Sequence, residues 1–478
     1  MLPVASVDNE SLLVRLAAME ARVASLERTV AAQRAEIARK DGFILYQQER
    51  IDKLEAALEE SRRRSKRQAA PFSKGDPGPA PKTPGRKRGD AHGRHGHRRV
   101  PTGTPDRELT AELPGCCPDC GGRIVHERDA TQWQVEVPDM RPTVTRITVE
   151  VGRCSGCKRR VQGHHPEQTS QALGAAGSGV GPRLKAWAMW LHYGMGLSFA
   201  RTAKVISYLG VEVTAGALCA SSARAASTEL VPVHAELVVR ANRSKSITMD
   251  ESGWRVGGRG RWLWVAANAE LTLCWIAPGR SFADATTVIT PDYDGVLVRD
   301  GYVVYDHYSH ATHQSCAAHL LRRASEMEAD LAGAERRIPA AAKAILKDAL
   351  AARNLPSPAE RATAAEQCRG RLDALCARPT GSDANRRLLK HLAHQAPHLF
   401  TFLTVEGIDA TNYRGEQAVR PCVVNRKTFG GNRTDPGART QGIVTSVIAT
   451  AAKQGHDVID YLADRARSPD PGLRILLG

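Results

Sequence analysis

Ser246-Ile247-Thr248-Met249-Asp250 is the stretch that decides the fold: an apolar, β-prone run that ends on an acid. Further β-prone runs follow at residues 261–267, 271–276 and 295–300, and the last of them again ends on an acid, Asp300. Much later, a helix-compatible segment, residues 412–421, carries a central Glu416. Short runs of this kind, separated by turn residues, predict neighbouring strands of a mixed α/β domain, which we place at residues 245–439.

Three carboxylates on separate elements form a set that suits divalent cations, because Mg²⁺ and Mn²⁺ prefer oxygen ligands. Two such ions, about 4 Å apart, activate the attacking oxygen and stabilise the leaving oxygen in phosphoryl transfer. We therefore predict that Asp250, Asp300 and Glu416 are catalytic and hold two Mg²⁺ or Mn²⁺ ions. The expected domain is a ribonuclease-H-like core that cleaves DNA.

Each strand-terminal acid has a competitor nearby. Glu251 follows Asp250 directly, but adjacent residues of a strand face opposite sides of the sheet, so only one of them can face the metals, and we choose Asp250. Asp306 follows Asp300 at a point where the chain has already left the strand. Asp300 ends the apolar run directly and precedes Gly301, which lets the chain turn, so Asp300 is the prediction.

Positive charge is concentrated in one segment. The formal net charge is +16, and residues 61–100 alone hold thirteen Lys or Arg against two Asp. Residues 65–109 are poor in apolar side chains, which predicts a basic linker that is disordered when free. Basic side chains that reach phosphates release counterions, so we predict non-specific contact with double-stranded DNA; a solvated spacer is the alternative. The residues predicted to bind DNA here are Arg62, Arg63, Arg64, Lys66, Arg67, Arg86, Lys87, Arg88, Arg98 and Arg99.

Residues 9–64 carry an apolar heptad repeat. Steps of four and three residues from Leu12 reach Leu58 through more than six heptads, with polar residues only at Gln33, Lys40 and Gln47. A stripe of this length predicts a coiled coil that joins copies of the chain into a homo-oligomer, and the central polar positions would set its register. The alternative is a long amphipathic helix that packs on its own protein.

Two Cys-x-x-Cys motifs lie within residues 110–170. Four thiolates at this spacing form a tetrahedral Zn²⁺ site, and alternating runs at residues 132–137 and 144–151 predict strands between the motifs, the pattern of a DNA-binding zinc ribbon. Cys116 is adjacent to the first motif, but Cys117 gives the better spacing. The predicted zinc ligands are Cys117, Cys120, Cys154 and Cys157, and the predicted phosphate contacts after them are Lys158, Arg159 and Arg160.

Helices are predicted for most of the remaining chain. In residues 175–240, two helical segments joined by a Gly210 turn, the second with Thr214 as its cap, suggest a helix-turn-helix. The second segment is poor in Arg and Asn, so a packing subdomain beside the core is an equal alternative. The stretch between Asp300 and Glu416 is too long for a loop and predicts a helical insertion at about residues 320–405. Residues 440–478 are predicted to be C-terminal helices.

Four side chains near the acids are predicted to assist them. Cys316 and His319 lie three residues apart on one helical face; His319 is therefore a candidate helper, although such a pair is more often structural. Arg420, Arg426 and Lys427 follow Glu416 and are predicted to hold the DNA backbone or the scissile phosphate, a solvated face being the alternative.

Composition bounds the class of protein. The eleven cysteines suggest metal ligands or buried thiols rather than disulfides. The sequence contains no run of eighteen apolar residues, so no membrane span is predicted. The N-terminus lacks the basic-then-apolar pattern of a secretory signal. We expect no membrane partner and a cytoplasmic, nucleoid-associated protein.

In this order the motifs resemble the insertion-sequence 66 family of bacterial Asp-Asp-Glu transposases, from the heptad helix to about residue 465. The resemblance rests on both cysteine pairs, Asp250-Glu251-Ser252, Asp300-Gly301-Tyr302, residues 316–323, and residues 412–421 with Arg426-Lys427. It implies the large transposase subunit, with Asp250, Asp300 and Glu416 in the three catalytic places.

The resemblance implies an enzyme that cleaves strands at insertion-sequence ends and joins them to target DNA, with Mg²⁺ and a structural Zn²⁺. Accessory transposition proteins are a further class of partner that the sequence leaves open. Ser252, Tyr413 and Gln417 differ from the family's usual Thr, Asn and Arg. Two alternatives remain: a non-catalytic DNA-binding regulator built on the zinc ribbon and coiled coil, and a decayed transposase copy.

Overall fold

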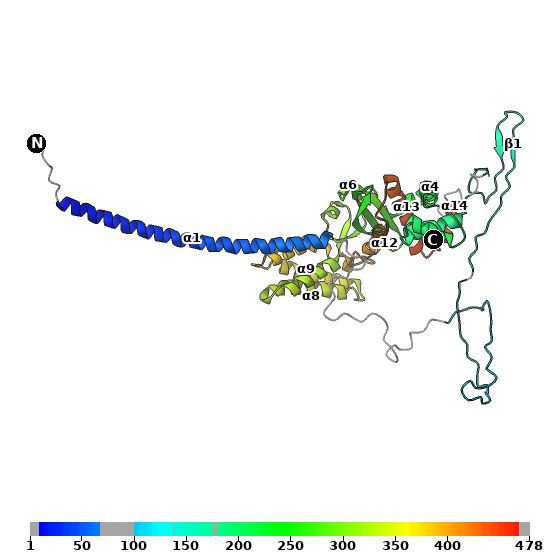
Figure 1. The fold of residues 1–478 in the computed structure, drawn as a ribbon, viewed down its shortest axis with the longest axis horizontal. Coiled ribbons are helices and arrows are strands. Elements are labelled where there is room, and N and C mark those ends of the chain that lie inside the picture. Colours follow the sequence, from blue (N-terminus) through cyan, green and yellow to red (C-terminus); the bar gives the residue numbers. More distant parts are fainter. Residues whose placement is uncertain (1–8, 67–99, 138, 175–178, 468–478) are drawn as a thin grey trace. The chain divides into compact units, whose positions relative to one another are not determined.

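The computed structural model describes residues 9–66, 100–137, 139–174 and 179–467 (Figure 1). The chain divides into two units, Met1–Gly103 and Thr104–Gly478, and each is described by itself. Several predicted DNA-binding residues lie outside the described residues: Arg67, Arg86, Lys87, Arg88, Arg98, Arg99 and the side chains of Arg62, Arg63, Arg64 and Lys66. No helix in the described part is both long enough and apolar enough to cross a membrane.

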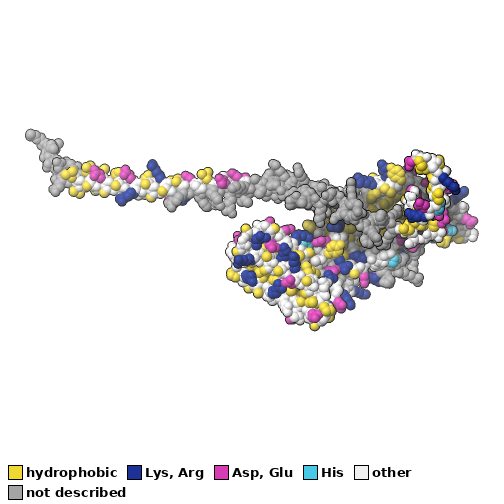
Figure 2. Space-filling view, turned by 90° about the horizontal axis from the view of Figure 1, so that it is seen from below, with side chains coloured by type: hydrophobic (Ala, Val, Ile, Leu, Met, Phe, Trp, Pro, Cys, Tyr) yellow, Lys and Arg dark blue, Asp and Glu magenta, His cyan; other side chains and the backbone are white. Residues whose placement is uncertain are grey.

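The helix of the first unit, α1 (Asn9–Lys66), runs without interruption over the predicted heptad repeat. Its apolar stripe is exposed: 56% of the Leu16 surface, 58% of Ile37 and 61% of Ile44 are accessible. Figure 2 shows such apolar side chains along the helix. The polar position Lys40 is paired with Glu36 of the preceding turn, at 2.8 Å.

The second unit is built on a five-stranded mixed sheet. β3 (Ser246–Val256), β4 (Arg259–Ala267) and β5 (Thr272–Ala277) form an antiparallel meander. β6 (Val296–Arg299) and β7 (Thr312–Ser315) continue the sheet in parallel beyond β3, which gives the order β5-β4-β3-β6-β7. Because β3 and β6 run parallel and Thr248 pairs with Val298, the C-terminal end of β6 lies beside the middle of β3, where Asp250 is.

Successive residues of each strand point to opposite faces of the sheet, and each face packs in a different hydrophobic core. On one face, Met249, Trp264 and Trp275 pack with α5 (Val231–Asn242) and α14 (Val458–Arg467), and on the other, Leu263 and Val265 pack with α12 (Tyr413–Phe429). Two short elements lie in the connections on either side of β6, α6 (Phe282–Ala285) and the 3₁₀ helix η4 (Val303–His307).

Helix α13 (Asp435–Lys453) runs along the outer edge of β5 and hydrogen-bonds to its unpaired backbone. The Cys274 amide donates to the Ser446 hydroxyl at 2.8 Å, and the Thr272 amide donates to Thr450 at 3.0 Å, while Thr450 donates back to the Thr272 carbonyl at 3.1 Å. A Cβ at Gly442 would lie 2.8 Å from the Cys274 carbonyl oxygen, so only glycine allows this approach. Side-chain hydroxyls therefore complete an edge that another strand would otherwise pair with.

The segment before the sheet is helical and packs on the core. It comprises α2 (Pro182–Met189), the π-helix η3 (Trp190–Gly194), α3 (Phe199–Ser207), α4 (Ala215–Ser227) and α5. Thr214 caps α4 by accepting the Ala217 amide at 3.2 Å. α4 buries Leu218 and Ala226 and packs against α13 as well as α3. This packing favours the alternative of a helical subdomain beside the core.

A helical insertion fills the chain between β7 and α12 (Figure 1). Its helices are α7 (Ala317–Asp330), η5 (Gly333–Arg336), α8 (Arg337–Ala352), α9 (Pro358–Cys376), α10 (Asp383–Gln395), η6 (Ala396–His398) and α11 (Thr401–Thr404). They share a core around Leu346, Leu372 and Leu388 that reaches Val298 of β6. The insertion is therefore packed directly behind the end of β6.

The strands predicted between the cysteine motifs are wrong. Residues 132–137 and 144–150 form no strand, and the segment instead contains a short hairpin, β1 (Val151–Arg153) with β2 (Arg160–Gln162), around the second motif. Trp133, Val135 and Val144 are 41%, 57% and 88% exposed. Alternation predicts a strand only where one face is buried, and here the apolar side chains have no core to enter.

Candidate active site

Asp250 lies within β3, on the face that α12 covers. Its Oδ1 accepts the amide of Glu251 at 2.9 Å. The pKa of Asp250 is raised to about 7, chiefly by burial; the neighbouring carboxylates of Glu251, Asp300 and Glu416 add to the rise, and the Glu251 amide opposes it. Three acids that are distant in sequence therefore influence one another at this point.

Asp300 follows the last residue of β6, and the strand register brings it beside Asp250. Thr248 pairs with Val298 in the parallel β3–β6 ladder, and each acid lies two residues beyond its paired residue. Asp300 therefore lies at the level of Asp250 in the sheet, one residue beyond the end of β6. Oδ1 of Asp300 accepts the Tyr302 amide at 2.8 Å, which fixes the carboxylate over the turn.

Asp306, the alternative second acid, is engaged elsewhere. Its Oδ1 accepts a hydrogen bond from Arg299 at 2.6 Å, and its Oδ2 lies 3.4 Å from His394. Arg299 is fully buried and also donates to Gln395 at 2.7 Å. Because Arg299 precedes Asp300 on the strand, it faces the opposite side, and it holds Asp306 there.

Glu416 comes from the first turn of α12, and a glycine brings this turn onto β3. A Cβ on Gly415 would lie 3.1 Å from both the Asp250 Cβ and the Thr248 Cγ2. The helix can therefore cross the strand directly at Asp250 only because residue 415 has no side chain. Glu416 is left 43% exposed, at the open side of the acids.

His319 lies beside Glu416. Its Nε2 is 3.4 Å from the Glu416 Oε1, and both the Cys316 thiol and the nearby acids raise its pKa. Cys316 is buried at the start of α7, and its sulfur accepts the Asn412 amide at 3.3 Å. The Cys316–His319 pair thus joins the start of α7 to the segment that leads into Glu416.

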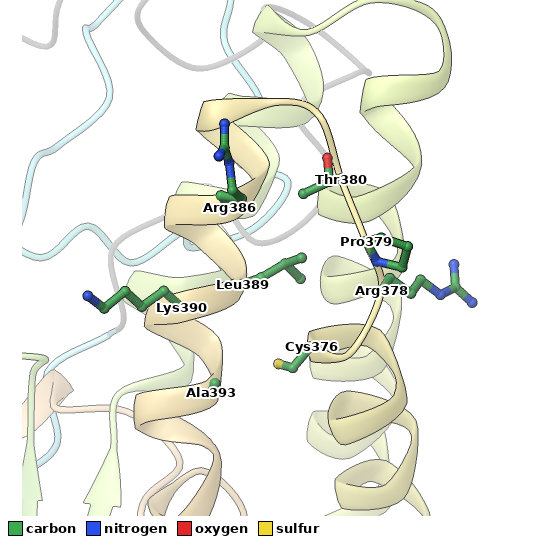
Figure 3. Close-up of a pocket in the computed structure, with 8 residues that line it drawn as sticks. All are labelled: Cys376, Arg378, Pro379, Thr380, Arg386, Leu389, Lys390 and Ala393. Carbon is green, nitrogen blue, oxygen red and sulfur yellow. The ribbon is translucent and has the colours of Figure 1, made fainter.

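The acids approach one another without forming a closed cage. No group of three or more His, Cys, Asp or Glu in the described ranges is close enough to hold a metal ion as it stands. Two hollows of the described structure lie away from the acids. One, of about 440 Å³, lies between the end of α9 and α10, with Leu389 and Thr380 toward it and Arg378 and Lys390 directed outward (Figure 3). The other, of about 420 Å³, lies between α5, β5 and α13.

Of the predicted basic helpers, Arg426 reaches the catalytic face. It donates to the Ser252 hydroxyl at 3.2 Å, and Ser252 faces the same side of β3 as Asp250. Burial lowers the pKa of Arg426, and the positive charge of Arg255 lowers it further. Arg420 and Lys427 are exposed on α12. The mutual repulsion of the Arg426 and Arg255 guanidinium groups favours an anionic ligand near them.

The four predicted zinc ligands form two separate pairs. In the first, Gly121 donates to the Cys117 carbonyl at 2.9 Å, and in the second, Lys158 donates to the Cys154 carbonyl at 3.0 Å. Gly121 and Lys158 both have a positive φ, at 72° and 59°, so the two turns have the same form. The amides of each turn lower the pKa of its first thiol, Cys117 and Cys154. The structure does not bring the pairs together.

The remaining predicted phosphate contacts are surface residues. Lys158, Arg159 and Arg160 are exposed on the β1–β2 hairpin, but the Lys158 ammonium donates to the Ser155 carbonyl at 2.7 Å. On the insertion, Lys and Arg side chains are mixed with acids over the face seen in Figure 2.

Sequence reasoning missed a polar network behind the acids. Arg280, Tyr302 and Tyr305 surround Glu251, which neighbours Asp250. These residues come from three separate segments with no characteristic spacing. The only signal was a second acid beside Asp250.

Comparison with known proteins gives one family. The family model described as "Transposase IS66 family" matches residues 177–440, from α2 through the sheet and insertion to the start of α13. No curated protein matches the chain.

Proposed function

The chain belongs to the IS66 family of transposases, and from this premise we propose that Asp250, Asp300 and Glu416 are the acids that catalyse DNA strand cleavage and transfer. The observation that carries the proposal is their convergence: the strand register puts Asp300 at the level of Asp250, and the first turn of α12, which bears Glu416, crosses β3 at Asp250. A meander of three strands followed by two parallel strands supports a ribonuclease-H-like core. The ion pair of Asp306 with buried Arg299 supports Asp300 as the second acid.

The donor set fits two Mg²⁺ or Mn²⁺ ions. All three groups are carboxylates, the donors that these ions prefer, and neither Asp250 nor Asp300 forms an ion pair with a described Lys or Arg. Uncompensated negative charge at a partly buried site favours a bound cation. When bound, a pair of such ions supplies activation of the attacking oxygen and stabilisation of the leaving oxygen.

The protein's own side chains orient the acids and the DNA. His319 is placed to hold one oxygen of Glu416 and to direct the other toward the site. Arg426 and Ser252 lie one strand pleat beyond Asp250 and would bind a backbone phosphate next to the scissile one. Arg420 and Lys427 extend this basic line along α12.

For the cysteine pairs we propose one structural Zn²⁺ held by Cys117, Cys120, Cys154 and Cys157. The donor set and the matching turns support it, since amide donors that favour thiolates are typical of zinc knuckles. Metal analysis of the purified protein should find one zinc per chain, and Cys154→Ser should lose it. A zinc-free wild type with unchanged DNA binding would rule the site out.

For α1 we propose a parallel, two-stranded coiled coil between copies of the chain. In the heptad, Val23, Val30, Ile37, Ile44 and Ile51 occupy one core position, and β-branched residues there favour parallel dimers. Such a dimer would let two catalytic units act on the two ends of one DNA element.

The test is a cleavage and strand-transfer assay on end-labelled element termini with Mg²⁺ or Mn²⁺. We expect metal-dependent 3′-hydroxyl ends from the wild type and Asp306→Ala, and none from Asp300→Ala, which should still bind DNA. Cleavage by Asp300→Ala would refute the site. Binding without cleavage by every protein would instead favour a non-catalytic DNA-binding regulator or a decayed copy.

A further inference from the structure

We propose that Glu251, Arg280 and Tyr302 form a clamp that positions Asp300 relative to Asp250, so that both carboxylates are in place before a metal binds. The inference rests on the proposed function and adds residues that lie behind the catalytic face. Its evidence is a continuous set of contacts from one acid-bearing strand to the other.

The clamp begins at Glu251, the residue after Asp250. Its side chain is only 1% exposed. Oε1 accepts Nε of Arg280 at 2.8 Å and also Nη2, and Oε2 accepts the Tyr305 hydroxyl. Both oxygens are therefore occupied inside the protein, so Glu251 is a structural partner of Arg280 and not a metal ligand.

Arg280 is a fixed anchor because its loop is held on both sides. The Gly279 carbonyl accepts the Trp264 indole N–H at 3.2 Å. The amides of Gly279 and Ser281 donate to the Asp284 carboxylate at 3.1 Å and 2.9 Å. A guanidinium on such a backbone loses little further freedom when it pairs with Glu251.

Tyr302 carries the contact on to Asp300. The Arg280 Cζ lies 3.6 Å from the centroid of the Tyr302 ring and 4.8 Å from that of Trp262. The Tyr302 hydroxyl donates to the Arg280 carbonyl at 2.6 Å, and the Tyr302 amide donates to Oδ1 of Asp300 at 2.8 Å. The residue that stacks on Arg280 thus also orients the second acid.

The clamp has a physical task at this place. Asp250, Asp300 and Glu416 repel one another when no cation is bound, and Asp300 lies in a turn beyond the last hydrogen bond of its strand. The β3–β6 ladder fixes the backbone only as far as β6. The clamp ties the turn to β3 from the opposite face and opposes this separation. Groups behind metal ligands change metal affinity by about 10- to 100-fold when removed.

The experiment measures Mn²⁺ binding to the full-length protein without DNA, by the loss of the free-ion electron paramagnetic resonance signal. We expect Arg280→Ala to weaken binding by about tenfold or more, Arg280→Lys to restore part of it, and Tyr302→Phe, which loses one hydroxyl, to weaken it by a few-fold. In cleavage assays the same variants should need correspondingly more Mn²⁺, with a smaller deficit at saturation.

The matched control is Glu328→Gln, which breaks the Lys343–Glu328 ion pair of 2.8 Å in the insertion and should bind Mn²⁺ as the wild type does. Wild-type Mn²⁺ affinity in both Arg280→Ala and Tyr302→Phe would overturn the clamp, whatever their stability, and leave the proposed function standing. A wild type that neither binds Mn²⁺ nor cleaves DNA would overturn both.

Discussion

Asp250→Asn should stabilise the metal-free protein at neutral and alkaline pH. Burial and neighbouring acids raise the pKa of Asp250 from 3.8 to about 7. Each pKa unit corresponds to about 1.4 kcal/mol, so the ionised group costs the folded state up to about 4 kcal/mol. An acid whose folded-state pKa is raised keeps its proton in the folded protein after the unfolded chain has released it. Stability therefore falls as pH rises from about 4 to about 7, and the full cost is present above that window.

The assay is urea unfolding followed by tryptophan fluorescence, with a metal chelator, at about pH 5 and about pH 8. The wild type should lose stability between the two, and Asp250→Asn should lose less and exceed the wild type at the higher pH. Added Mn²⁺ should stabilise the wild type only. The control is Asp348→Asn, an exposed acid of the insertion paired with Arg371. An Asp250→Asn protein no more stable than the wild type at about pH 8 would refute the account of this site.

Three further outcomes are expected. Asp306→Asn should lower the free energy of unfolding by about 3 kcal/mol, because it leaves buried Arg299 without its carboxylate partner. The folded fraction should still cleave DNA, and a stability in urea equal to that of the wild type would contradict the prediction. His319→Gln should reduce cleavage by about 10- to 100-fold with unchanged DNA affinity in a gel-shift assay, because Glu416 loses the partner at one oxygen; an unchanged rate would remove His319 from the site. Ile37→Lys should convert a dimer into a monomer in light scattering, because it places a charge in the core of the coiled coil, and a monomeric wild type would disprove that interface.

The central sheet could be predicted because each of β3 to β6 corresponds to its own run of β-prone residues in the sequence. Each β-prone run became a strand, and Asp300 directly follows β6 as expected. The prediction that Asp250 ends its strand is wrong, because β3 continues to Val256 in its pairing with β4. Membership of the family, first inferred from a resemblance, is confirmed by the family match. The choice of Asp300 over Asp306 rested on the end of the apolar run and the Gly301 turn. The ion pair of Asp306 with buried Arg299 was not visible in the sequence.

Other features depend on contacts between distant segments and have no local signature. Nothing near Arg280 predicts that it pairs with Glu251 and stacks on Tyr302, and nothing near Gly415 predicts that β3 lies against it. The prediction of strands between the two cysteine motifs was wrong for a related reason. Alternation of apolar and polar residues was read as burial, but residues 132–137 have no packed layer to bury their apolar side.

The hydrogen bonds from the Ser446 and Thr450 hydroxyls of α13 to the edge of β5 have a consequence for shortened chains. A product that ended before Gly442 would lack Ser446 and Thr450 and would expose the backbone of β5. A bare sheet edge recruits strands from other molecules. We expect shortened products to aggregate through this edge, so α13 protects the sheet from pairing with strands of other molecules.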